Sequence, residues 1–256
     1  MTRTDDSALF TDPVPYVNNG ETSGSSPFDN LYPWNEMTIV THNGNSLVKI
    51  PKFWYKMEKT ASSLSIKIAN KPAEGFKVSP AHRDRGEGEK NYVYIGRYHS
   101  DSAYKSTSGV KPVTNITRAT ARTNTHALGE EYWQLDMSLW ITIWLLYLVE
   151  FANWNSQLMI GYGCGGGSSV GKENSGSTDS MPYHTGTMQN SKTTYGVGIQ
   201  YRYIEDPWAN VVDWVDGITF NGANIYAYES SDQYSDNYAS EQAVLIGTRP
   251  TSSNYI

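Results

Sequence analysis

The chain has 256 residues, 38% hydrophobic and 18% charged, which is enough for one large domain or two small ones with a substantial core. The net charge is −6 and the Lys and Arg residues are scattered singly, so there is no basic stripe to neutralise phosphates, and nucleic-acid binding is not expected. The only cysteine, Cys164, excludes an intramolecular disulfide framework and a cysteine-based zinc site.

Residues 1–30 differ in composition from the rest of the chain. They mix Asp, Ser, Gly, Asn and Pro with few apolar anchors. Such a composition predicts an N-terminal arm or anchoring segment that is ordered only against a partner. A frayed terminus is the alternative. The folded domain is expected to span residues 31–256.

The first hundred residues are predicted to be mostly antiparallel sheet. MTIVTH (37–42) and SLVKIPKFWYKME (46–58) flank the turn signal Asn43-Gly44-Asn45, which is typical of a hairpin. SLSIKIA (63–69) alternates apolar and polar residues as a half-buried strand does. NYVYIGRYH (91–99) is expected to return as a further strand.

Two helices are predicted next. Asn115 or Thr117 would cap the first, which runs to about Ala127 and is stopped by Gly129. The second is expected over residues 137–154, where apolar side chains recur at helical spacing and cover nearly every face. Such a helix is typically buried. Its apolar run, residues 137–149, is shorter than the roughly 20 residues that cross a bilayer, so membrane insertion is not expected.

The chain beyond residue 157 is rich in loops. TTYGVGIQYRYIED (193–206), ITF (218–220) and ANIYAYE (223–229) are predicted strands, and residues 232–240 form a Tyr/Ser/Asp/Asn loop. The glycine-rich segment ending at Lys172 resembles a phosphate-binding loop. However, Glu173 stands where that motif needs Ser or Thr, so nucleotide binding is not expected.

The stretch IEDPWANVVDWVDG, residues 204–217, places four carboxylates among two tryptophans. Asp213 and Asp216 could serve as a glycosidase pair, with Trp208 or Trp214 stacking on a sugar. Asp before Pro or Gly is also a common turn residue that binds nearby backbone amides. The apolar residues between these acids favour the structural interpretation. The five histidines show no metal-ligand spacing and are interpreted as surface residues, and no cofactor or metal is expected.

Several segments resemble a known family. ANVVDWVDG (209–217) is similar to the Gly-Asn-Val-Trp-Glu-Trp signature of the formylglycine-generating-enzyme-like branch of the C-type lectin fold. Asn210, Val211 and Trp214 match that structural motif, and Asp213 replaces Glu. Residues 49–58 and 111–123 resemble an early strand and the entry to the first helix of this branch. Residues 132–157, 160–163, 183–186 and 201–208 resemble, in order, segments of its phage tail and receptor-binding variant. The resemblance covers roughly residues 31–256.

The resemblance has two departures. The enzymes of this branch act through a pair of cysteines, and this chain has only Cys164, so their catalysis does not carry over. The family also continues past a PTSGYI-like segment into further strands, whereas this sequence stops at PTSSNYI. In related proteins diversified by retroelements, the variable ligand-facing residues lie in that final part.

The resemblance implies an α+β domain of C-type lectin type, with two helices packed on a twisted antiparallel sheet and long loops. It implies a non-enzymatic phage virion protein, at the tail tip or as a surface decoration, that binds a bacterial surface glycan or protein. Tyr and Asn suit such a display, since Tyr contributes large contact area at low entropic cost. The expected exposed ligand-binding set is Tyr226, Tyr228, Tyr234, Tyr238, Asn224 and Asn237.

Symmetry commonly multiplies weak contacts in virions, so a homotrimer and contacts with other virion proteins are expected. Two alternatives stay open. One is a purely structural virion component that docks on tail or capsid neighbours. The other is a glycan hydrolase that uses Asp213 and Asp216.

Overall fold

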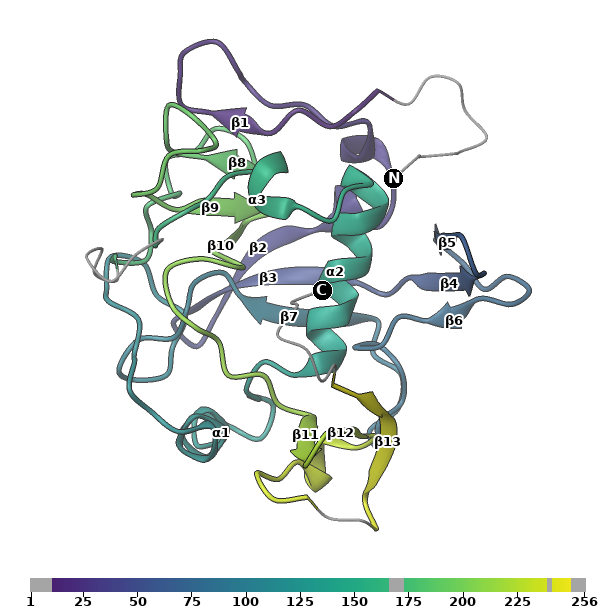
Figure 1. Cartoon of the computed structure of the whole chain (residues 1–256). Helices are drawn as coiled ribbons and strands as arrows, with labels where there is room; N and C mark the ends of the chain where they lie inside the picture. The colour runs from purple at the N-terminus through teal and green to yellow at the C-terminus, as the bar shows by residue number, and fades with distance from the viewer. Residues whose placement is uncertain (1–10, 166–172, 239–240, 250–256) are drawn as a thin grey trace.

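The computed structural model describes residues 11–165, 173–238 and 241–249. In these ranges the chain is a mixed α+β protein with helices α1 (Arg118–His126), α2 (Met137–Phe151) and α3 (Ser156–Met159) (Figure 1). Four small, mostly antiparallel sheets surround α2. The predicted α+β class is therefore confirmed.

Helix α2 begins and ends at clear local signals. The Asp136 side chain accepts a hydrogen bond from the Leu139 amide, as an N-cap does. Ala152 adopts a left-handed backbone with φ of 48°, which ends the helix three residues before the predicted Trp154. Helix α1 is capped by Thr117, one of the two predicted caps, whereas Asn115 lies outside the helix at φ of 59°.

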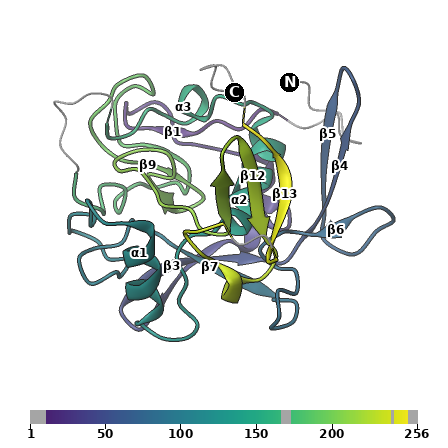
Figure 2. The same cartoon turned by 60° about the horizontal axis from the view of Figure 1, so that its bottom comes forward.

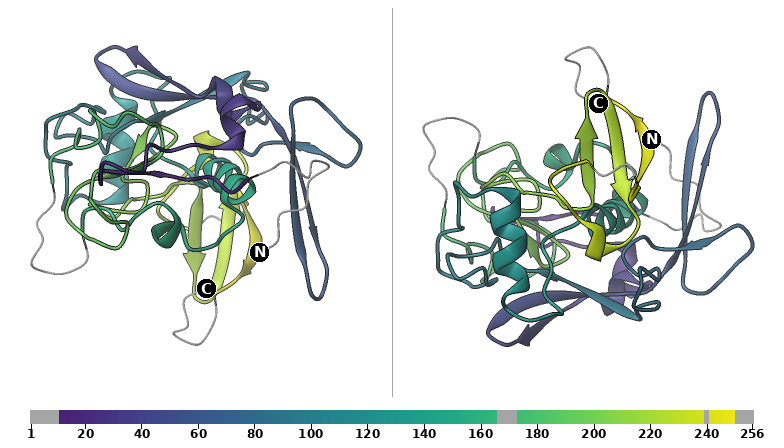
Figure 3. Two further views of the ribbon diagram at one scale, coloured as in Figure 1. Left: turned by 90° about the horizontal axis from the view of Figure 1, so that it is seen from above. Right: turned by 90° about the horizontal axis from the view of Figure 1, so that it is seen from below.

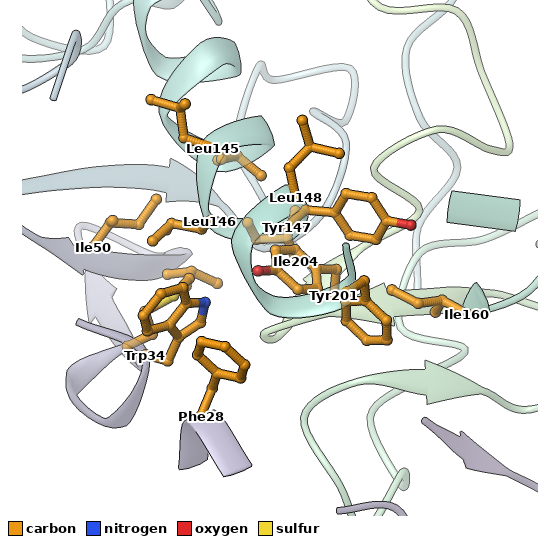
Figure 4. Close-up of a cluster of buried hydrophobic side chains, with 14 of the residues drawn as sticks. Phe28, Trp34, Ile50, Leu145, Leu146, Tyr147, Leu148, Ile160, Tyr201 and Ile204 are labelled. Carbon is orange, nitrogen blue, oxygen red and sulfur yellow. The ribbon is translucent and has the colours of Figure 1, made fainter. Parts of the chain in front are cut away.

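The hydrophobic core forms around α2, which is buried on nearly every side, as predicted. Figure 4 shows leucines and Tyr147 of this helix between Trp34 and Phe28 on one side and Tyr201 and Ile160 on the other. The core includes fully buried side chains from the flanking strands, Val48, Ile50, Ile199 and Tyr201, and Phe53 from the β3–β4 connection. Segments from both halves of the chain therefore close on one helix.

Two sheets come from the first hundred residues. Strands β2 (Thr38–His42), β3 (Asn45–Pro51) and β7 (Tyr92–Gly96) form one antiparallel sheet in the order β2-β3-β7. The predicted hairpin is confirmed, because Asn43 and Gly44 both have positive φ, as a two-residue turn requires.

Strands β4 (Trp54–Lys59), β5 (Leu64–Ala69) and β6 (Lys77–Val78) form a second antiparallel sheet in the order β5-β4-β6. Figure 2 shows its β4–β5 hairpin standing apart from the body. The prediction of antiparallel sheet over this region is therefore confirmed.

The described residues of the N-terminal segment, 11–30, pack on their own chain, whereas the sequence predicted for residues 1–30 an arm or anchoring segment ordered only against a partner. Strand β1 (Tyr16–Val17) pairs in parallel with β8 (Gly186–Thr187). Strands β9 (Ile199–Tyr201) and β10 (Ile204–Glu205) extend the same sheet by antiparallel pairing, in the order β1-β8-β9-β10. The short helix η1 (Pro27–Asn30) places Phe28 in the core at 5% exposure. These residues are therefore folded on the domain within a single chain. Residues 1–10 lie outside the described part.

The last sheet has the order β11 (Ile218–Asn221), β12 (Asn224–Tyr228) and β13 (Ala243–Thr248). Its register shifts by one residue between Ile225 and Tyr226. Strands β11 and β12 were predicted and β13 was not. Two short helices, η2 (Trp34–Glu36) and η3 (Ser231–Gln233), complete the described elements.

A buried ion pair joins three distant parts of the chain. Arg202, in the β9–β10 turn, donates to both carboxylate oxygens of Glu150 on α2, at 2.5 and 3.1 Å. Glu150 is 0% and Arg202 2% exposed. Asp29 lies 2.9 Å from the guanidinium, and Ser26 and Tyr201 donate to the Glu150 carboxylate. This set thus fixes the N-terminal segment, α2 and the β9–β10 turn against one another.

Replacing Glu150 by Gln leaves the Arg202 charge without its closest counter-charge in a site closed to water. We expect the free energy of unfolding to fall by about 3–5 kcal/mol, as when one partner of a buried pair is lost. Urea denaturation measures this change. The control is Glu74→Gln at an exposed carboxylate, where a change within about 0.5 kcal/mol is expected. Equal stability of the two variants would contradict this role.

Candidate functional site

The predicted tyrosine set does come together, but mostly by packing on itself. The rings of Tyr226 and Tyr238 lie 4.3 Å apart between centroids, and both residues are half-buried. Tyr228 is only 3% exposed, and its hydroxyl donates to the Asn237 carbonyl. Its prediction as an exposed residue is therefore wrong, because the loop that carries Tyr234 and Asn237 packs against it.

Tyr234 is also engaged internally. Its hydroxyl donates to the Asp136 carboxylate at 2.9 Å and accepts from Arg85. Burial, and then the neighbouring Asp136 charge, raise the pKa of this hydroxyl above its ordinary range. Asn224 is half-buried and Asn237 is exposed. None of the six residues is among the described residues that line the open cleft between β7, the segment before α2 and residues 204–214.

Asp213 and Asp216, the candidate catalytic pair, have separate structural partners. Arg122 of α1 donates to both oxygens of Asp216, at 2.5 and 2.8 Å, and Asp216 is 1% exposed. The Asp213 carboxylate lies 3.3 Å from His99 Nε2. Both oxygens of Asp216 are occupied by Arg122, so neither is directed at a substrate as a catalytic acid or base must be.

The described residues form an open cleft of about 1010 Å³. Its sides are the edge strand β7, residues 98–104, the segment 131–140 leading into α2, and residues 204–214 of the predicted carboxylate motif. Aromatic side chains of these segments line it: Tyr92, Tyr94, Tyr98, Tyr104, Trp133, Trp140 and Trp214. Charged side chains stand among them, including Arg83, Lys90, His99, Glu131 and Asp213.

Two indole rings in this cleft are exposed and held in place. Trp214 is 52% exposed, although its Nε1 donates to the Ile116 carbonyl at 2.9 Å. Gln134 donates to the Trp214 carbonyl at 2.8 Å, which ties this loop to the segment before α2. The neighbouring Trp133 is 37% exposed, and its ring packs on His126 at 4.7 Å between centroids. Both rings therefore offer a face to a ligand at little entropic cost.

The motif residue Asn210 fixes the loop of residues 204–214 through hydrogen bonds to Glu173 and Cys164. It has a left-handed backbone, and its amide both accepts from the Glu173 N–H and donates to the Glu173 carbonyl. Its own N–H donates to the Cys164 carbonyl at 2.7 Å. Val211 lines the cleft, and Val212 is 96% exposed. Asn210 thus joins the 173 loop to the loop that carries Asp213 and Trp214.

The pKa of His99 is set by carboxylates of this loop. Burial alone would lower its pKa, but the hydrogen bond and charge of Asp213, followed by the charges of Asp206 and Glu205, raise the pKa of His99 above 6.5. The contribution of the pair to stability is therefore full below pH 6.5 and is lost as the pH rises through the higher folded-state pKa.

One acidic residue, Glu205, lines the cleft, and a second, Asp206, is buried behind it. The Glu205 carboxylate lines it and accepts from the Gly176 and Thr178 amides at 2.7 and 2.8 Å. Asp206, beside it, is 2% exposed and accepts from the Ile199 amide at 3.1 Å. Burial, and then the Glu205 charge, raise the pKa of Asp206 to about 7.

The histidines are not all surface residues, contrary to the prediction. His82 is 0% exposed, with its ring nitrogens bonded to Ser79 and the Ile50 carbonyl. Burial, and then the Arg202 charge, lower the pKa of His184 to about 4, so its contact with Asp29 at neutral pH is a hydrogen bond of the neutral ring. Partners far along the chain determine these environments.

Neither a metal-ligand set nor a membrane span emerges from the described residues. No group of three or more His, Cys, Asp or Glu side chains in that part is arranged to hold a metal ion. In the 232–236 loop, Asp236 pairs with Arg118 and Arg122, at 2.7 and 3.0 Å. No helix of the described part is long and apolar enough to cross a bilayer. The phosphate-loop-like residues 166–172 lie outside that part.

Sequence reasoning singled out Trp214 and Asp213 but missed Trp133, His99 and the tyrosines of β7. One available signal was the order Tyr92, Val93, Tyr94, Ile95, in which the aromatic rings alternate with core residues. Tyr92 and Tyr94 are 45% and 48% exposed, whereas Val93 and Ile95 pack on the core. Strand β7 and the loop of Trp214 are far apart in the sequence but line the same cleft, and no local sequence pattern predicts this proximity.

Comparisons with known proteins do not add an identity. No protein-family model, curated protein or solved structure matches this chain.

Replacing Asp206 by Asn tests the charge change of this buried carboxylate. The raised pKa means that the folded protein binds the Asp206 proton more tightly than the unfolded chain, so this group costs stability as the pH rises from about 4 to 7. Asn keeps the acceptor for the Ile199 amide without the charge. We expect the variant to gain roughly 2–4 kcal/mol relative to the parent between pH 4 and pH 8. Urea denaturation at both pH values measures the difference, and a pH-independent difference would contradict it.

Proposed function

We propose that this protein is a non-enzymatic phage virion protein, at the tail tip or as a surface decoration, that binds a glycan of the bacterial surface in its main cleft. The observation that carries the recognition function is the pair of exposed indole rings, Trp133 and Trp214, in an open cleft of about 1010 Å³. The virion assignment rests on the resemblance of the sequence to phage receptor-binding domains. The same resemblance supports a C-type lectin-like arrangement of the helices and sheets.

The chemistry of the cleft fits a sugar chain. A sugar ring has an apolar face that packs on an aromatic side chain and hydroxyl groups that need hydrogen-bonding partners at its rim. The cleft combines Trp133, Trp214 and Tyr94 with His99 and Asp213 on the same surface. Its volume lies at the upper end of the range for ligand sites, about 300–1,000 Å³, and suits a short oligosaccharide.

A hydrolase that uses Asp213 and Asp216 is favoured less. Two catalytic carboxylates must both face the sugar, one of them as an acid at the operating pH. Asp216 is covered and bound through both oxygens to Arg122, and it does not line the cleft. Asp213 lines the cleft, where His99 is its charged neighbour. The contacts of both carboxylates support a role in holding the scaffold.

The binding test uses the purified protein with intact cells and isolated surface polysaccharide from a panel of bacterial strains. We expect saturable, strain-selective binding that weakens about tenfold or more in Trp214→Ala and in Trp133→Ala, because each removes an aromatic contact surface. Trp214→Phe, which keeps a ring, should retain most of the affinity. Binding is measured by calorimetry for the polysaccharide and by sedimentation for the cells.

The matched control is Trp154→Ala. Trp154 is 58% exposed and packs on Trp144, outside the described lining of the cleft. Its loss should leave the affinity unchanged. Loss of binding in Tyr226→Ser/Tyr238→Ser but in neither cleft variant would move recognition to the tyrosine set. Absence of binding to every strain would favour the purely structural virion component.

Replacing Asp213 by Asn separates binding from hydrolysis. We expect no release of reducing sugars from cell-wall glycans by the parent or the variant, and a lower melting temperature in the variant. Because the pair with His99 acts mainly below the raised His99 pKa, this loss should be larger at pH 6 than at pH 9. Turnover by the parent that disappears in an equally stable variant would overturn the non-enzymatic proposal.

A further inference from the structure

Strand β13 is an exposed apolar sheet edge. It is the terminal strand in the order β11-β12-β13, and only β12 pairs with it among the described residues. Three consecutive aliphatic side chains, Val244, Leu245 and Ile246, are 51%, 54% and 57% exposed. Figure 3 shows the sheet extending from the body, with β13 in yellow along one side. An unpaired apolar edge of this kind is a template for another strand.

The charges at the two ends of this strand indicate which strand would pair with it. The described segment 241–249 reads EQAVLIGTR, with Glu241 at its start, Arg249 at its end and no charge between them. Both end residues are exposed, and no ion pair is formed by either side chain within the described part. An antiparallel copy of the same segment, centred on Leu245, would place Glu241 of each chain opposite Arg249 of the other.

The same register also matches the remaining side chains. Val244 would face Ile246 of the second copy, Leu245 would face Leu245, and Gln242 would face Thr248. Pairs of β-branched residues and pairs of opposite charge both stabilise neighbouring antiparallel strands, whereas like charges oppose pairing. A two-fold contact needs a surface that is complementary to itself. This segment meets that condition in its end charges and in Leu245 at the axis, next to the register shift that leaves Ile246 without a partner on β12.

We infer that two copies of this chain associate through antiparallel pairing of β13 with β13, joining two β11-β12-β13 sheets into one six-stranded sheet. The outer backbone groups of each β13 gain hydrogen-bonding partners, and aliphatic side chains of the two copies come into contact across the joint. The assembly is a two-fold dimer, in contrast to the homotrimer expected from the sequence. Its basis is independent of the glycan proposal.

Charge reversal tests this pairing on the full chain. Light scattering over a dilution series should give twice the chain mass at high concentration and the chain mass on dilution. Glu241→Arg should raise the concentration of half-association by roughly tenfold, because arginines then face each other at both ends. The double variant Glu241→Arg/Arg249→Glu restores opposite charges and should restore the parent curve. Ile246→Lys should abolish association.

The matched control is Leu158→Lys at another exposed leucine, 50% exposed on α3, which should leave the curve unchanged. Leu245→Cys should form a disulfide-linked dimer under oxidising conditions, because the two copies of residue 245 face each other at the axis; the native Cys164 is buried. A chain that stays monomeric at every concentration overturns the inference. A trimer, or a dimer that the double variant does not restore, also overturns it.

Discussion

The buried pair of Glu150 and Arg202 is the constraint on which the rest of the structure depends. An arginine closed off from water is stable only when it is paired, so α2, the β9–β10 turn and the N-terminal segment must meet at one place. Hydrophobic burial around α2 supplies most of the stabilisation but is not directional. The ion pair fixes how α2 and the β9–β10 turn are oriented against each other, and Asp29 joins the N-terminal segment to the same pair.

This anchoring determines where the cleft can lie. Arg202 leads directly into Ile204 and Glu205, which begin the segment that forms one side of the cleft. Asn210 then holds the loop to the 173 region, and its far end presents Trp214. The four carboxylates of the stretch 204–217 therefore act first as supports. Their partners include backbone amides, His99 and Arg122. The exposed ring of Trp214, between Asp213 and Asp216, is left free to contact a ligand.

The sequence predicts those features of the fold that neighbouring residues encode. The helical spacing of apolar residues predicted α2, and Asn43-Gly44 predicted the β2–β3 hairpin, because neighbouring residues encode both. Strand β13 escaped prediction because both of its faces are exposed, so its apolar residues do not alternate with polar ones. The tyrosines of β12 show the same limit: Tyr226 and Tyr228 have the same spacing pattern, but only Tyr228 is buried.

Anchors that act over long range were also missed. Asp29 is a single carboxylate in a polar segment, and its side-chain partners Tyr183, His184 and Arg202 lie more than a hundred positions away. Phe28 packs on the nearby Trp34 and, with it, on the core around α2. The cleft has the same origin, since it joins β7, the residues before α2 and the 204–214 loop. Trp214 was identified as a residue for sugar stacking, whereas Trp133 beside it was not.

The most direct measurement of the central claim is an NMR titration of the indole N–H signals with surface polysaccharide from a strain that the protein binds. The chain has eight tryptophans, and each contributes one indole N–H signal. Ligand in the cleft predicts that the signals of Trp133 and Trp214 shift in saturable fashion while that of Trp154 stays in place. Saturable binding that leaves both cleft signals unmoved would contradict the assignment of recognition to this cleft.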